Sequence, residues 1–68
     1  MVDLKEGDYV FLINDFEETP RKYLLVYFNS GDAGIVKVQN VENGFSKYLW
    51  KKDFEIQLEN AELWNKMM

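Results

Sequence analysis

Residues 35–50 read IVKVQNVENGFSKYLW, and this stretch decides the fold. β-Branched residues dominate its first half and aromatic residues its second half, as is typical of strands in a half-buried sheet. Between the two halves, Asn43 and Gly44 reach positive φ angles at little cost, which suits the tight turn of a hairpin. We therefore expect two paired strands, at about residues 34–41 and 45–50.

The length of the turn decides which side chains of this hairpin share a face. A two-residue turn pairs Lys37 with Trp50 and puts Tyr48 on the same face, so that one lysine and two aromatic side chains form a surface patch. A three-residue loop shifts the pairing by one residue. Val38 then faces Tyr48, and both aromatic residues join the core. The sequence leaves both registers open.

Three further stretches predict strands on either side of the hairpin. Residues 9–14 and 21–29 are apolar on both alternating faces, which indicates partial cover on both sides, as in a small barrel. Residues 54–59 alternate between apolar and polar side chains, and this pattern predicts a fifth strand with Phe54, Ile56 and Leu58 facing the core.

The C-terminal residues 60–68 predict a short helix. Asn60 is a typical N-cap residue, and apolar side chains recur after it at helical spacing. So short a helix is marginal unless its apolar stripe is docked. Three alternatives remain open for this tail: a lid on its own barrel, a segment that binds a partner, or a contact in a homodimer.

The order of these elements resembles the SH3-like small barrels, a superfamily that includes Tudor, KOW and SH3-type domains. The resemblance covers residues 4–59 and begins with the entry Lys-Glu-Gly-Asp-Tyr-Val at residues 5–10. It implies a mainly β fold: a five-stranded SH3-like barrel over about residues 4–59, followed by the helical tail within one domain of residues 1–68. Asp15, Glu17 and Glu18 match the acidic first loop of peptide-binding SH3 domains, but the paired aromatic residues of those domains are missing near the first strand.

Composition narrows the function more than any motif does. The chain has 68 residues and contains neither cysteine nor histidine, which removes disulfides, the common zinc sites and histidine-assisted nucleophiles. The acidic loop at residues 14–20 lacks the spacing of a calcium loop, and the glycine loop at residues 29–34 lacks the ending of a P-loop. We therefore predict no cofactor, no metal and no enzymatic activity.

Charge is unevenly distributed along the chain. The net charge of −4 combines acidic ends with a basic middle, since residues 34–52 carry four lysines and one glutamate. The N-terminal residues lack the features of a signal peptide, and no apolar run is long enough to span a bilayer. A cytoplasmic protein without membrane contacts is the expectation.

These observations favour a non-enzymatic protein-binding module, such as a small acidic adaptor or an inhibitor of a partner protein. Aromatic and methionine side chains are enriched at the centres of interfaces. The alternative is binding of single-stranded nucleic acid through the lysine and aromatic residues of the hairpin. The candidate partner-binding residues are Lys37, Tyr48, Trp50, Trp64, Met67 and Met68, and the candidate nucleic-acid contacts are Lys37, Lys47, Lys51 and Lys52.

Overall fold

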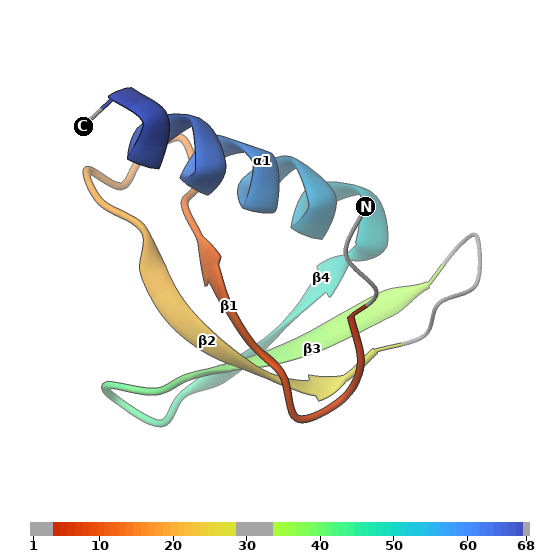
Figure 1. Ribbon diagram of the computed structural model, residues 1–68. Helices are drawn as coiled ribbons and strands as arrows, with labels where there is room; N and C mark the ends of the chain where they lie inside the picture. The colour runs from red at the N-terminus through yellow and green to blue at the C-terminus, as the bar shows by residue number, and fades with distance from the viewer. Residues whose placement is uncertain (1–3, 29–33, 68) are drawn as a thin grey trace.

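The computed structural model describes residues 4–28 and 34–67, which form an antiparallel sheet and one long helix. The elements in chain order are β1 (Tyr9–Leu12), β2 (Arg21–Tyr27), β3 (Ile35–Asn40), β4 (Ser46–Trp50) and α1 (Lys51–Met67). Each strand pairs with the next, so that the sheet order is β1-β2-β3-β4 and the outer strands of the described sheet are β1 and β4 (Figure 1). The described sheet is open, and it contains four strands instead of the five expected.

The expected fifth strand is wrong, because residues 54–59 lie inside α1. The core-facing residues of α1 follow a helical spacing: Phe54 and Ala61 are buried, and Leu58 packs against the core from one turn beyond Phe54. Ile56, which alternation placed beside them, is 48% exposed. The helix therefore begins at Lys51, and Asn60 lies in its middle instead of capping its start.

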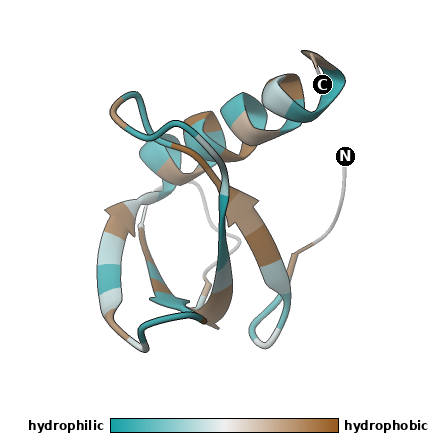
Figure 2. Ribbon diagram, turned by 90° about the vertical axis from the view of Figure 1, so that its left-hand side faces the viewer, coloured by the Kyte–Doolittle hydropathy of each residue, from teal (hydrophilic) through white to brown (hydrophobic). Residues whose placement is uncertain are grey.

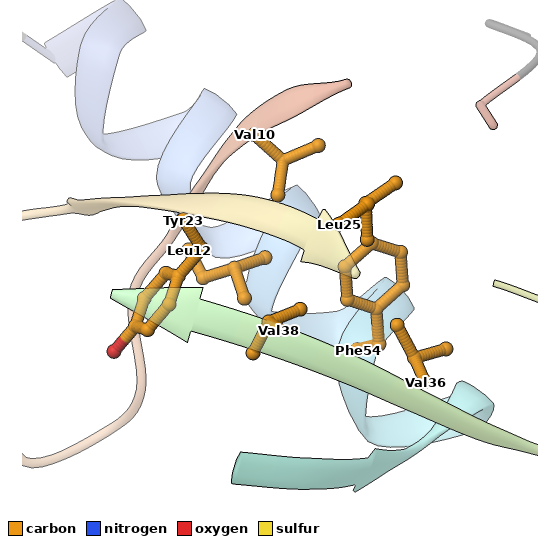
Figure 3. Close-up of a cluster of buried hydrophobic side chains, with 7 residues drawn as sticks. All are labelled: Val10, Leu12, Tyr23, Leu25, Val36, Val38 and Phe54. Carbon is orange, nitrogen blue, oxygen red and sulfur yellow. The ribbon is translucent and has the colours of Figure 1, made fainter. Parts of the chain in front are cut away.

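The core lies between the concave face of the sheet and α1 (Figures 1 and 3). In β1 and β3 buried side chains alternate with less buried ones, and Figure 2 shows hydrophobic residues both on the strands and on the helix. In Figure 3 the ring of Phe54 reaches from the helix toward the side chains of Leu25 and Val36. The buried cluster consists of Val10, Leu12, Tyr23, Leu25, Val36, Val38 and Phe54.

The β3–β4 hairpin has neither of the two expected registers. Lys37 pairs with Tyr48 and Ile35 pairs with Trp50. The same pairing continues to Asn40 opposite Phe45, where the N–H of Asn40 donates to the carbonyl of Phe45, so residues 41–44 form a four-residue loop. This pairing is displaced by two residues from the register of a two-residue turn. Because side chains alternate with a period of two, Lys37, Tyr48 and Trp50 still share one face.

A buried asparagine holds this four-residue loop in place. The side-chain oxygen of Asn40 accepts hydrogen bonds from the backbone N–H groups of Glu42 (2.8 Å) and Asn43 (3.2 Å). The N–H of Gly44 donates to the carbonyl of Asn40 at 2.8 Å, and Gly44 has a φ of 78°, which glycine adopts without a steric penalty. Asn40 thus closes the turn from the end of β3.

Replacing Asn40 by alanine is expected to lower the free energy of unfolding by about 1–3 kcal/mol, since two backbone donors lose their partner. Asn43→Ala is the matched control in the same loop, because its side chain accepts a single exposed hydrogen bond, from the N–H of Phe45. Urea denaturation of both variants measures the difference. Equal losses of stability would contradict the role assigned to Asn40.

Two further details concern β2 and the loop that precedes it. A register shift between Leu25 and Tyr27 interrupts the alternation of β2, so Tyr27 is exposed while Phe28 packs on the core. Phe16, in the acidic loop between β1 and β2, is 96% exposed. The glycine-rich connection expected at residues 29–34 falls largely outside the described residues.

Candidate binding surface on the outer face of the sheet

The sheet has one face packed against α1 and a second face without a packing element from the described part of the chain. Cross-strand pairing places alternate residues of all four strands on this second face. We call it the outer face. It comprises Tyr9, Phe11, Lys22, Leu24, Tyr27, Ile35, Lys37, Gln39, Ser46, Tyr48 and Trp50.

Large apolar side chains are exposed on the outer face. Tyr48 and Trp50 are 66% and 65% exposed. Tyr9 and Phe11, at the opposite edge of the sheet, are each more than half exposed, and Tyr27 and Ile35 lie between these two pairs. Single exposed apolar side chains are ordinary on a soluble protein, but a group of six on one face is a feature of interaction surfaces.

Two lysines of the outer face lie against tyrosine rings. The Lys22 ammonium is 4.7 Å from the ring centroid of Tyr9, and the Lys37 ammonium is 5.5 Å from that of Tyr48. Both distances are within the range of cation–π attraction. Lys37 is also paired with Tyr27 on its other side, so this lysine is flanked by two tyrosines across three strands.

Positive and negative charges are segregated in the fold. Within the four strands every charged residue is basic: Arg21, Lys22, Lys37 and Lys47. The described acidic residues lie outside the strands, in the segment before β1, in the loops and in α1. The outer face therefore combines aromatic rings with positive charge, although the chain as a whole is acidic.

The structure brings together three of the six predicted partner-binding residues. Lys37, Tyr48 and Trp50 lie on the outer face, in adjacent strands. Trp64 is partly buried and Met67 is exposed near the end of α1. At the rise of an α-helix they lie about 20 Å and about 25 Å along the helix from Trp50. Met68 lies outside the described residues.

The predicted nucleic-acid contacts are divided between different parts of the surface. Of the four lysines, Lys37 alone lies on the outer face. Lys47 is paired with buried Val38, and its ammonium is 5.0 Å from the ring centroid of buried Tyr23. Lys51 and Lys52 form the start of α1.

Sequence reasoning missed the contribution of β1 and β2 to this surface. The alternation of residues 9–12 correctly separates Tyr9 and Phe11 from the core residues of β1. The sequence did not predict the pairing of β1 with β2, which brings Lys22 beside these aromatic side chains. The sequence suggested cover on both faces of β1, whereas its outer face is open.

Two shallow grooves flank α1. One, of about 270 Å³, is lined by Ile13, Asn14, Asp15, Asn60, Leu63, Trp64 and Met67. The other, of about 230 Å³, lies beside β4 and is called the edge groove here. It is lined by Asn14, Asp15, Leu49, Asp53, Ile56, Gln57 and Asn60.

Across residues 4–28 and 34–67, no three acidic, histidine or cysteine side chains converge on a point suitable for a metal ion. No helix in the same part of the chain has the length and apolar character needed to cross a membrane. Comparisons with protein-family models, curated proteins and solved structures found no match.

Proposed function

We propose that this protein is a non-enzymatic module that binds another protein through the outer face of its sheet. The observation that carries the proposal is the set of exposed aromatic side chains gathered there, with Tyr48 and Trp50 the most exposed of those in the strands. Tyrosine and tryptophan are the residues that most often supply the binding energy of an interface.

The arrangement of the face supports this proposal further. Aromatic side chains offer a large contact area and lose little conformational entropy on binding, because few of their bonds rotate. Lys22 and Lys37 add positive charge at two points, which favours a partner that presents carboxylates there. An adaptor or inhibitor role, a cytoplasmic location and the relation to SH3-like barrels are part of the same proposal.

The test compares two exposed aromatic residues in different places. Trp50→Ala is expected to weaken binding of a partner captured from native cell extract by about 30-fold or more, the effect of losing a central interface residue. Phe16→Ala is the matched control, because Phe16 is more exposed but lies off the outer face. Pull-down followed by titration of the identified partner measures both effects. Unchanged binding by Trp50→Ala would contradict the proposal.

The same comparison decides the role of the C-terminal part of α1. Met67→Ala is expected to leave that partner bound, because Met67 is distant from the outer face. If Met67→Ala abolishes binding while Trp50→Ala preserves it, the contact surface is the end of the helix. Sedimentation analysis of the wild-type protein tests the homodimer in the same preparation.

Single-stranded nucleic acid is the second candidate ligand of the outer face. The favouring observation is that the strands carry basic charges and no acidic ones, with two lysines beside tyrosine rings. Bases stack on such rings while lysines contact phosphates. Titration with oligothymidylate at two salt concentrations tests this candidate, because phosphate contacts weaken steeply with salt. No binding at low salt would remove it.

A further inference from the structure

The free edge of β4 presents backbone groups to a further strand. In an antiparallel pair, the backbone N–H and C=O groups of every second residue exchange hydrogen bonds with the partner strand. Those of the residues in between point away from that strand. Two bonds fix the alternation here: the N–H of Asn40 donates to the carbonyl of Phe45 at 2.8 Å, and that of Lys51 donates to the carbonyl of Gly34 at 3.0 Å. Ser46 and Tyr48 therefore direct their N–H and C=O groups away from β3.

This edge has no strand beside it in the described part of the chain, where β4 is terminal in the sheet. Natural edge strands are commonly protected by a proline, a bulge or a charged side chain, especially lysine. β4 contains no proline, and its pairing with β3 is regular over all five residues. Its one charged residue, Lys47, directs its ammonium away from the free edge, to 5.0 Å from the ring centroid of Tyr23 in β2. The edge is thus able to accept an extended peptide.

Different surfaces lie on the two sides of the edge. On one side are Tyr48 and Trp50 of the outer face, both largely exposed. On the other side, the edge groove is lined by Leu49 of β4 and by two acidic residues, Asp15 and Asp53. Because successive side chains of a strand point to opposite sides, an added strand would meet these two surfaces at alternate positions.

We propose that the partner contributes an extended segment that pairs with β4 as a fifth strand of the sheet. The segment has about five residues, the length of β4. Its side chains alternate between apolar residues beside Tyr48 and Trp50 and small or basic residues facing the edge groove. This inference rests on the proposed function and specifies the form of the protein partner.

The experiment uses a displayed library of random 12-residue peptides as the probe, selected on the whole protein made by chemical synthesis. Methylation of the backbone nitrogen of Tyr48 removes a donor at the free edge and leaves the hydrogen bonds between β3 and β4 intact. The selected peptide is expected to bind this variant at least about tenfold more weakly, with an unchanged melting temperature. Methylation of the backbone nitrogen of Leu49 is the matched control. The N–H of Leu49 faces β3, so its removal breaks a hydrogen bond within the sheet and lowers the melting temperature, but it removes no donor from the free edge.

The outcomes separate this inference from the proposed function. A peptide that loses binding on Trp50→Ala but not on methylation at Tyr48 uses the outer face without adding a strand, which overturns the inference alone. Failure to select any peptide also overturns it. Binding that is indifferent to both changes overturns the inference and the proposed function together.

The predicted alternation has its own test within the same selection. Peptides selected on the wild-type protein are expected to carry lysine or arginine at alternate positions, and this preference is expected to weaken on Asp53→Asn, which removes one of the two acidic charges of the groove. A preference that persists unchanged would show that the peptide does not face the edge groove.

Discussion

Replacing Phe54 by alanine is expected to lower the free energy of unfolding by about 3–5 kcal/mol, the usual cost of deleting a large buried side chain. Phe54 is 1% exposed and joins α1 to the sheet through its contacts with the buried cluster. Its ring centroid lies 5.9 Å from that of Phe28. A domain of this size has only a few kcal/mol of stability, so this variant is expected to be largely unfolded at room temperature.

Ile56→Ala is the control for Phe54→Ala. Ile56 is about half exposed, so its truncation is expected to cost about 1 kcal/mol or less. Circular dichroism and urea denaturation measure both variants. A strand at residues 54–59 would bury both side chains equally, so two large and similar losses would contradict the helix.

The second large effect is expected in β1, from Leu12→Ala. Leu12 is fully buried, and its truncation is expected to lower the free energy of unfolding by about 2–5 kcal/mol. Its neighbour Phe11 has the larger side chain but points to the outer face, where it is about half exposed. Phe11→Ala is therefore expected to cost about 1 kcal/mol.

Urea denaturation of the two β1 variants tests whether the outer face is free of the core. The informative result is which variant loses more stability. Although Phe11 has the larger side chain, Phe11→Ala is expected to lower the free energy of unfolding less than Leu12→Ala. A loss for Phe11→Ala equal to that for Leu12→Ala would mean that the outer face is covered, and that it is unavailable to a partner.

Much of the sheet could be predicted from local sequence. The β-branched and aromatic residues of the hairpin, and the apolar run at residues 9–12, identify strands because such side chains fit a pleated, half-buried sheet. The turn length could not be predicted, since the Asn-Gly pair suits a two-residue turn equally well. What decides it is the side chain of Asn40, which closes a longer loop by bonding to two backbone donors.

The helix was missed because a short apolar pattern can fit two periods. Phe54, Ile56 and Leu58 alternate, but Phe54 and Leu58 are also one helical turn apart. The buried Ala61 extends this second spacing beyond the six residues that suggested a strand. The glutamate, glutamine and leucine residues in this segment also favour a helix. Tracing the pattern to residue 61 would have distinguished the two structures.

The candidate surface was predictable only in part. Lys37, Tyr48 and Trp50 come together because any loop with an even number of residues, two or four, puts them on the same face. Tyr9 and Lys22 join them through the pairing of β1 with β2 and of β2 with β3. That pairing depends on the whole sheet and leaves no signal in a local stretch of sequence.

The measurement that tests the central claim most directly is the cross-strand contact pattern of the hairpin by nuclear magnetic resonance. The structure pairs Lys37 with Tyr48 and Ile35 with Trp50 at positions that do not exchange hydrogen bonds, where Cα atoms are about 4.5 Å apart. Strong Hα–Hα cross peaks are expected for both pairs. Cross peaks that pair Tyr48 with Val38 would contradict the account, because Tyr48 and Trp50 would then belong to the core and the outer face would lose its aromatic surface.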